Sequence, residues 1–356
     1  MTGHRPGDEP HLEVDPPDAA RDRSEPRSLR YHDLAGSRPI PAGRVLVIGS
    51  VALLLAAVLN ADGLFELATR QPVGWKRDVA ATAVAPFCAV GRITHLKDVR
   101  AEIRDAADKE VHDCSDGPRS GSATFDEVAV APTEPAEGPA ITRRAPTTAA
   151  PLRMWLGGDS MTIELAQSVE EAVAARPEVE LATHPQVSSG LTRPDFFDWP
   201  AYFRDEVLPT RPEAVVVMFG ANDSQGMDID GAPYQPSSPE WQAEYRRRVG
   251  VVMDQLRGDG RLVLWVGQPR MRDTGFDQRM ATLDRIYAQE AEDRPWVRFL
   301  DSRAILSPDG EGYQATADGV SLRQGDGIHL DRAGADLLAE AVLDAVEAEV
   351  MATSPP

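Results

Sequence analysis

From residue 151 onward, short apolar runs alternate with stretches in which apolar residues recur every three or four positions. This alternation of strand and helix patterns predicts a parallel β-sheet covered by helices on both faces. In such sheets the active site forms at the carboxyl ends of the strands. The predicted strands are LRMWLGG, VELATHP, AVVVMFG, RLVLWVGQP and WVRFLDS. The predicted helices carry Trp241, Tyr245, Val249, Val252, Met253 and Leu256, and Leu338, Ala341, Val342 and Ala345.

The N-terminal part of the chain has a different composition. Residues 1–43 are rich in Pro, Asp, Glu and Arg, so they cannot bury enough apolar surface to offset the entropy of ordering, and a disordered cytoplasmic tail is predicted. Residues 44–65 include a charge-free stretch from Val45 to Ala61, which is near the lower limit for one bilayer-spanning helix. We therefore predict a transmembrane signal anchor at residues 44–65.

Basic residues set the predicted orientation of this anchor. From position 27 on, four arginines precede the charge-free stretch and three nearby basic residues follow it, so the positive-inside rule places the N-terminus in the cytoplasm by a modest margin. A cleaved signal peptide and a buried globular helix are the alternatives, although the leading segment is long and the cleavage pattern weak for a signal peptide. The residues are Arg27, Arg30, Arg38 and Arg44 before the stretch from Val45 to Ala61, and Arg70, Lys76 and Arg77 after it.

Two segments connect the anchor to the α/β region. Residues 66–114 have a helical pattern and are predicted to form membrane-proximal helices, whereas residues 115–150 are rich in Pro, Thr, Ala and Gly, as is typical of a flexible linker. Cys88 and Cys114 form neither a CxxC pair nor a zinc-finger spacing, so no cysteine-based metal site is predicted. They are either a disulfide, if this part of the chain lies outside the cell, or two separate structural thiols.

The charge of the chain narrows the class of partner. The 356 residues carry a formal net charge of -20, and phosphate binding needs clustered Lys and Arg, so a nucleic-acid partner is excluded. A hydrophobic fraction of 42% is sufficient for a well-packed core in the α/β region. We assign residues 151–352 to this region.

The first candidate for catalysis is Ser160, in the run WLGGDSMT at the end of the first predicted strand. A serine between a strand and a helix is usually an N-cap, whose side-chain oxygen accepts a backbone N–H. A second feature favours chemistry. His329 follows Asp326 by three residues in GDGIHLDRAGADLLAEAV, and a carboxylate that accepts the Nδ1–H of a histidine makes it a general base for a serine. The alternative for His329 is a structural histidine.

A third feature could stabilise negative charge. Asn222 follows a predicted buried strand in MFGANDSQ, and Gly190 follows the second predicted strand. The Asn222 amide, the Gly190 N–H and the Ser160 N–H could together bind the oxyanion formed during ester hydrolysis, with each donor contributing about 3 kcal/mol. The alternative role for Asn222 is to close an Asx turn.

Together these residues resemble a known family. The blocks GGDSMT, Gly190, GAND and DGIH are similar, in type and order, to the four blocks of the SGNH (GDSL-type) hydrolases. The stretches SGLTRPDFFDWP, LWVGQPRMRD and GDGIHLDRAGADLLA resemble the bacterial membrane-anchored branch catalogued as domain of unknown function 459. The resemblance covers residues 151–350, and an ordinary α/β-hydrolase is disfavoured because the nucleophile lies in G-D-S rather than G-x-S-x-G.

The resemblance implies a fold and roles for individual residues. The fold would be a flavodoxin-like three-layer α/β/α sandwich with a five-stranded parallel sheet, preceded by one transmembrane helix. Ser160 would be the nucleophile, His329 the general base and Asp326 the residue that orients it, while Ser160, Gly190 and Asn222 would form the oxyanion hole. Asp159 and Asp223 would brace their loops through backbone hydrogen bonds. No metal or cofactor would be needed.

This reasoning predicts a serine esterase outside the cell membrane that removes O-acyl groups, acetyl in particular, from envelope glycans. An acyltransferase would use the same triad, a lysophospholipid hydrolase is less favoured, and a non-catalytic envelope binding protein would have no need for an intact triad. The predicted substrate contacts are Arg193, Phe196, Trp199 and Gln225, for which packing and loop bracing are the alternative roles.

Overall fold

The computed structural model describes residues 41–69, 71, 74–94, 114, 122–130, 145–258, 260–310 and 312–351. Most of the predicted cytoplasmic tail and residues 95–113 of the predicted membrane-proximal segment lie outside these ranges. The chain divides into two units, Met1–Leu53 and Leu54–Pro356. The β-sheet and all of the candidate site residues belong to the second unit.

Five parallel strands form the central sheet, as predicted. They are β1 (Leu152–Gly158), β2 (Val179–Pro185), β3 (Ala214–Met218), β6 (Leu262–Val266) and β7 (Val297–Leu300), and they lie in the order β2-β1-β3-β6-β7. Every residue of β3 and β6 is buried, as expected for continuous apolar strands that helices cover on both faces. This strand order reverses direction between β1 and β3, and ligands bind at such a reversal in open α/β sheets.

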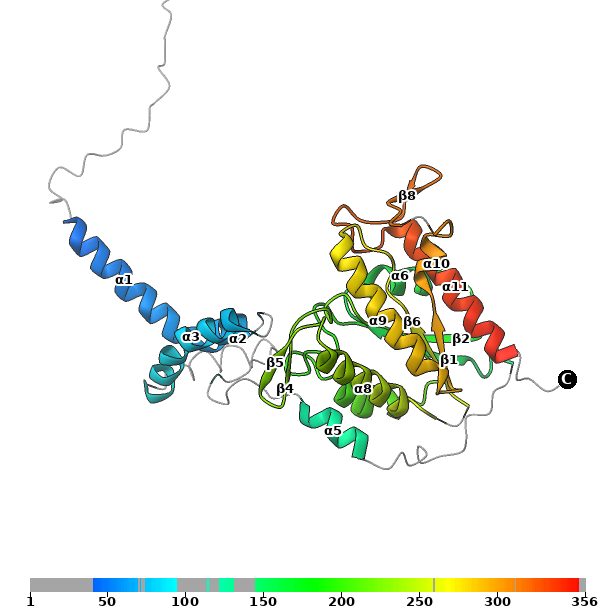
Figure 1. Cartoon of the computed structure of the whole chain (residues 1–356), viewed down its shortest axis with the longest axis horizontal. Helices are drawn as coiled ribbons and strands as arrows, with labels where there is room; N and C mark the ends of the chain where they lie inside the picture. Colours follow the sequence, from blue (N-terminus) through cyan, green and yellow to red (C-terminus); the bar gives the residue numbers. More distant parts are fainter. Residues whose placement is uncertain are drawn as a thin grey trace, which may run out of the picture. The chain divides into compact units, whose positions relative to one another are not determined.

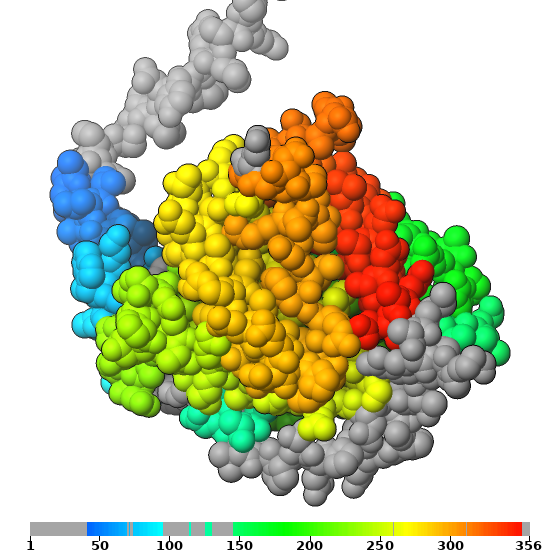
Figure 2. Space-filling model, turned by 45° about the vertical axis from the view of Figure 1, so that its right-hand side comes forward, coloured from blue at the N-terminus to red at the C-terminus, as the bar shows by residue number. Residues whose placement is uncertain are grey.

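Helices cover the two faces of the sheet (Figure 1). On one face α6 (Thr162–Val173) packs against α11 (Arg332–Met351), and on the other α8 (Pro239–Gln255) packs against α9 (Thr274–Glu292). Figure 2 shows the orange residues around the edge strand β7 between the yellow α9 and the red α11. Each predicted helix is present, and α8 and α9 begin at the side-chain caps Ser238 and Asp273. The predicted three-layer fold is confirmed.

The remaining elements of the α/β region are short. They are α7 (Trp199–Tyr202), a π-helical turn (Phe203–Val207), a 3₁₀ turn (Leu208–Thr210), α10 (Ser302–Leu306), and the two-stranded ribbons β4 (Met227–Ile229) with β5 (Ala232–Tyr234) and β8 (Thr316–Ala317) with β9 (Val320–Ser321). They connect or extend the main elements, and the segment between β2 and α7 carries several of the candidate site residues.

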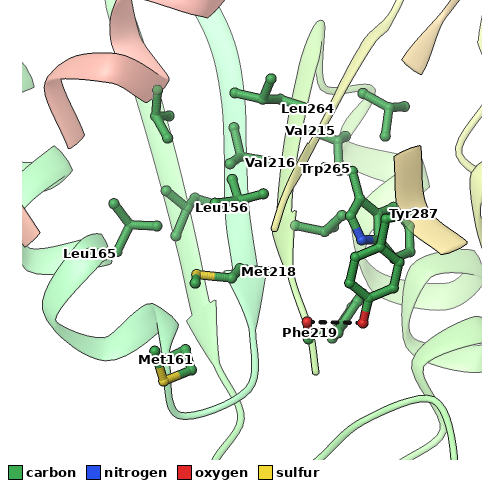
Figure 3. Close-up of a cluster of buried hydrophobic side chains, with 14 of the residues drawn as sticks. Leu156, Met161, Leu165, Val215, Val216, Met218, Phe219, Leu264, Trp265 and Tyr287 are labelled. Atoms are coloured by element: carbon green, nitrogen blue, oxygen red, sulfur yellow. Dashed lines mark hydrogen bonds between the residues drawn. The ribbon is translucent and has the colours of Figure 1, made fainter. Parts of the chain in front are cut away.

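The hydrophobic core lies between the sheet and its helices. Figure 3 shows Leu156 of β1 and Leu165 of α6 on one side of the sheet, and Trp265 of β6 with Tyr287 of α9 on the other. All four side chains are buried. The Tyr287 hydroxyl donates to the carbonyl oxygen of Phe219 at 3.2 Å (Figure 3). This bond ties α9 to the loop after β3, which carries Asn222.

The predicted anchor is divided between two helices. The helix α1 (Ala42–Leu59) has 18 residues and a mean hydropathy of 2.3, so it is long and apolar enough to cross a membrane. Residues 61–65 belong instead to α2 (Ala61–Thr69), because Asp62 and Glu66 give this segment a polar face while Phe65 is buried. The helix that is long and apolar enough to cross a membrane therefore ends at Leu59, whereas the predicted anchor extended to residue 65.

A helical hairpin follows α1. It consists of α2 and α3 (Trp75–Thr94), which pack against each other. Cys88 of α3 forms a disulfide with Cys114, and the backbone N–H of Cys114 donates to the Asp62 carboxylate at 3.1 Å. The small core of this hairpin contains Ala61, Phe65 and the two cysteines. Of the two possibilities for the cysteines, the structure has the disulfide.

The predicted linker, residues 115–150, contains a helix. This is α5 (Ser122–Val130), and it packs against α7 and α8. Phe125 of α5 is fully buried in the main core, and the Arg248 guanidinium lies 4.9 Å from the centre of its ring. The prediction of a flexible linker throughout this segment is therefore wrong for residues 122–130. The buried Phe125 ring gives this short helix enough apolar contact to stay packed against α7 and α8.

Candidate active site

Three side chains from distant parts of the chain meet at the carboxyl end of the sheet. The Ser160 hydroxyl oxygen lies 2.9 Å from Nε2 of His329, and Nδ1 of the same ring lies 2.6 Å from the Asp326 carboxylate. The nucleophile, base and orienting carboxylate of a serine hydrolase need these contacts. The structure brings together the three residues for which the sequence predicts a catalytic triad.

The environment of Asp326 keeps it ionised. Partial burial raises its pKa, but hydrogen bonds from the His329 ring and from the backbone N–H groups of Ile328 and His329 outweigh this effect and lower the pKa to about 2. One carboxylate oxygen accepts both N–H groups, at 2.8 and 3.1 Å, and the other faces the ring. A negative charge here favours the His329 tautomer that carries a proton on Nδ1 and presents a free Nε2 to Ser160.

The backbone around β1 directs Ser160 toward His329. Gly158 has a φ of 154°, which side-chain-bearing residues rarely adopt, and a Cβ atom at this position would collide with the Met218 carbonyl oxygen at the end of β3. The α6 helix begins at Thr162 with Met161 as its N-cap residue. The Ser160 side chain therefore does not cap this helix, and the N-cap interpretation of Ser160 is wrong.

The three donors predicted for an oxyanion hole lie on neighbouring loops. Among the described residues, neither the Ser160 N–H nor the Gly190 N–H donates a hydrogen bond, so both are available to a substrate. The Asn222 amide donates one of its two N–H groups to the carbonyl oxygen of Ser189 at 3.1 Å, which orients the side chain and leaves the second N–H. An oxyanion hole requires such preorganised donors that need no rearrangement.

Two buried aspartates brace these loops, as predicted from the sequence. Asp159 accepts the N–H of Met161 at 2.9 Å with one oxygen, and the N–H groups of Gly220 and Ala221 at 3.1 and 3.0 Å with the other. This arrangement joins the loop after β1 to the loop after β3. Burial raises the pKa of Asp159 to about 7 against the lowering effect of these bonds.

Asp223, on the loop after β3, connects that loop to the loop after β2 and to α8. One of its oxygens accepts the N–H and the hydroxyl of Thr192, at 2.8 and 3.0 Å, and the other accepts the Tyr245 hydroxyl at 2.8 Å. A Cβ atom on Gly190 would collide with the Asp223 carboxylate. The Gly190 backbone and the Asn222 loop therefore approach each other closely, and this proximity requires a glycine at position 190.

A pair of buried tyrosines extends this network. The hydroxyls of Tyr245 and Tyr287 lie 2.6 Å apart, and burial raises the pKa of both well above the usual range. Both phenols therefore stay protonated and can donate hydrogen bonds. The sequence identified Tyr245 only as a core residue of a helix, because a tyrosine at helical spacing carries no signal for its hydroxyl partner.

A pocket opens beside the loops that follow β2 and β3. Its volume is about 420 Å³, within the range of small-molecule sites. Three of the four predicted substrate contacts, Arg193, Phe196 and Gln225, line it together with Asn222. Trp199 does not, because its side chain is fully buried and its ring N–H donates to the Ser189 hydroxyl at 3.1 Å. The other lining residues are Ser188, Ala221 and Ser224.

One buried arginine that sequence reasoning missed supports the loop of His329. The Arg323 guanidinium donates to the carbonyl oxygens of Ile328, His329 and Arg270. Burial lowers the pKa of Arg323 to about 10. Its sequence position, two residues before the start of GDGIH, carries no pattern that separates it from the other arginines.

Within the part of the chain that the structure describes, no three His, Cys, Asp or Glu side chains are grouped so as to hold a metal ion.

Replacing Asn222 by alanine is expected to lower kcat for ester hydrolysis by about 10²- to 10³-fold with little change in KM, because the lost donor acts mainly in the transition state. Steady-state kinetics on an aryl acetate would measure this. Gln235→Ala is the control, because Gln235 has the same kind of amide side chain at an exposed position that does not line the pocket, and it should stay close to wild type. A wild-type kcat for Asn222→Ala would exclude this side chain from the oxyanion hole.

Several solved structures resemble the chain at low identity. A lipase/acylhydrolase from Enterococcus faecalis is 19% identical, with 55% of this chain and 95% of that one covered and a TM-score of 0.41. An acetylxylan esterase from Geobacillus stearothermophilus is 18% identical, with coverages of 56% and 93% and a TM-score of 0.41. The acetyl xylan esterase AlAXEase is 18% identical, with coverages of 55% and 99% and a TM-score of 0.42.

No curated protein matches the chain in sequence. The family described as "Protein of unknown function (DUF459)" matches it over residues 153–345. This match covers more than half of the chain and includes the serine, histidine and aspartate that meet at the carboxyl end of the sheet. The chain therefore belongs to the DUF459 family, the branch that its longer motifs resemble.

Proposed function

We propose that the protein is a serine esterase that hydrolyses short O-acyl esters, acetyl esters in particular, on glycans of the cell envelope. The observation that carries this proposal is the continuous contact from the Ser160 hydroxyl through the His329 ring to the Asp326 carboxylate, at 2.9 and 2.6 Å. The uncommitted N–H groups of Ser160 and Gly190 support it, because a binding site for a neutral sugar would not need them.

The first step transfers the acyl group to the protein. The Ser160 oxygen attacks the ester carbonyl carbon while its proton passes to Nε2 of His329. The carbonyl oxygen becomes an oxyanion, and the Ser160 N–H, the Gly190 N–H and the Asn222 amide stabilise it. The bond to the sugar oxygen then breaks, the proton on Nε2 passes to that oxygen, and the sugar leaves with a free hydroxyl.

The second step returns the protein to its starting state. A water molecule loses a proton to Nε2 of His329 and attacks the acyl carbon on Ser160. The same donors hold the second oxyanion. The bond to the Ser160 oxygen breaks, this oxygen takes the proton back from Nε2, and the acid leaves. Asp326 stays ionised in both steps, because its pKa of about 2 lies far below neutral pH.

The pocket beside Asn222 favours a polar part of the substrate. Its volume is about 420 Å³, and five of the seven described residues that line it are polar or charged. A long acyl chain would need a deeper apolar cavity to recover the free energy of leaving water. This argues for an acetylated sugar over a lipid ester.

Two features support a location outside the cytoplasm. The helix α1 has the length and mean hydropathy of a membrane span. Beyond it in the chain, Cys88 and Cys114 form a disulfide, and disulfides persist in oxidising compartments. With the N-terminus in the cytoplasm, the esterase would face the cell envelope.

Chain-length selectivity tests the proposal. The purified full-length protein is expected to hydrolyse an aryl acetate about 10-fold or more faster than the aryl octanoate, because the described residues that line the pocket beside Asn222 are mostly polar and offer extra methylene groups little apolar surface. A fluorophosphonate probe should label Ser160, and O-acetylated polysaccharide should release acetate. No labelling would leave only a binding role, and transfer of acetyl to an added glycan without free acetate would identify a transferase.

A further inference from the structure

Arg193 lines the pocket, but its charged end is bound elsewhere. Its guanidinium donates to both oxygens of the Asp195 carboxylate, at 2.7 and 2.8 Å. It also donates to the backbone carbonyl oxygens of Thr69 and Gln71, at 2.6 and 3.1 Å. Four of its five N–H groups are therefore committed, one of them to Thr69 at the end of α2 and one to Gln71 just beyond it.

A second arginine joins this network from the hairpin. Arg77 of α3 lies 3.2 Å from the Asp195 carboxylate. The side chains of Arg77, Arg193 and Asp195 are only 12%, 5% and 11% exposed. Because the three charges are largely removed from water, loss of Asp195 would leave two buried guanidinium groups without their shared carboxylate, which is far more costly than losing a surface ion pair. Loss of Arg77 would leave Asp195 paired with Arg193 but would break the ion pair between α3 and this carboxylate.

The contact completes the carboxyl end of α2. The last carbonyl groups of a helix have no partner inside the helix, and a positive charge nearby is favourable. The Thr69 hydroxyl bonds back to the carbonyl oxygens of Phe65 and Glu66, while Arg193 bonds to the carbonyl oxygen of Thr69 itself. The carboxyl end of α2 is therefore bonded to a residue of the pocket wall.

On the pocket side, the same residue belongs to the segment that carries the oxyanion donor. Gly190 lies three residues before Arg193, and Thr192 is fixed to Asp223. The Phe196 N–H donates to the Arg193 carbonyl oxygen at 2.9 Å, and Phe196 lines the pocket. Any shift of Arg193 would therefore move both the pocket wall and the backbone that follows Gly190.

We propose that the α2–α3 hairpin is a functional part of the esterase site, and that Arg77 and Asp195 are positioning residues that act on the pocket through Arg193. This inference rests on the esterase function proposed above. The hairpin holds the segment from Ser188 to Phe197 in its working conformation, and Arg193 serves this attachment rather than contacting the substrate.

The test uses the full-length protein in detergent and compares two arginines of the same helix. Arg77→Ala is expected to lower kcat/KM for an aryl acetate by about 10- to 100-fold, as misplacement of a binding wall does. Arg77→Lys should recover part of this loss, since it restores the charge. Arg92→Ala is the matched control because Arg92 is an exposed residue of α3, and it should behave as wild type.

Two further measurements distinguish a positioning role for Arg77 from a loss of folding and from a failure of the proposed esterase function. Thermal unfolding would verify that Arg77→Ala is folded at the assay temperature, and separate kcat and KM values would show the change in KM that a displaced pocket wall predicts. If the wild type hydrolyses the ester and Arg77→Ala matches Arg92→Ala, the positioning role is wrong although the esterase function stands. If the wild type neither hydrolyses the ester nor reacts with a fluorophosphonate, the proposed function itself has failed.

Discussion

Ser160→Ala is expected to lower kcat for an aryl acetate by about 10⁴- to 10⁶-fold, which is the scale of nucleophile removal in serine hydrolases. The reason is that, among the described residues, the Ser160 hydroxyl is the one that lies in contact with Nε2 of His329, at 2.9 Å. Steady-state kinetics would measure the loss, and the same variant should not react with a fluorophosphonate.

Ser168→Ala is the matched control for this substitution. Ser168 is buried in α6, the helix that follows the nucleophile, and its hydroxyl has no hydrogen-bond partner among the described residues. The alanine variant should therefore keep wild-type activity and fold normally. Ester hydrolysis by Ser160→Ala at the wild-type rate would show that the reaction takes place at another site.

Asp326→Asn is expected to lower kcat by about 10⁴-fold, and more than Asp326→Ala does. One side-chain oxygen accepts the N–H groups of Ile328 and His329, so an asparagine would keep its oxygen there and turn its NH₂ group toward Nδ1 of the ring. The ring would then carry its proton on Nε2, facing Ser160, and could not act as a base.

Kinetics of the two variants at neutral pH would decide this point. An alanine at position 326 leaves the ring free to exchange tautomers, so part of the population can still accept the serine proton. Equal losses for the two variants would mean that the carboxylate acts mainly by holding the loop, and a nearly active Asp326→Asn would remove Asp326 from the catalytic group.

The fold and the centre of the site could be predicted because local patterns carry them. The runs AVVVM and LVLWV are apolar at every position, which is typical of strands in a sheet that helices cover on both faces. They form the central strands β3 and β6. Ser160 and Asn222 follow the two adjacent strands on either side of the reversal in strand order. Their proximity follows from this topology, because the carboxyl ends of parallel strands meet at one edge.

The substrate side of the site was less predictable, because it depends on contacts between residues far apart in the chain. Trp199 was predicted to contact the substrate, yet its ring is fully buried. Arg193 reaches carbonyl groups more than 120 positions earlier, and a carbonyl group leaves no mark in a sequence. Phe125 is a single aromatic residue in a low-complexity segment, so its burial in the core had no periodic signal either.

The Cys88–Cys114 disulfide has a consequence for producing the protein. The cytosol of a common expression host keeps thiols reduced, so material made there would lack the covalent closure of the hairpin and depend on its few apolar side chains. Material routed through an oxidising periplasm should retain that closure. Two laboratories using the same gene could therefore measure different specific activities, and counting free thiols in each preparation before the assay would reveal the cause.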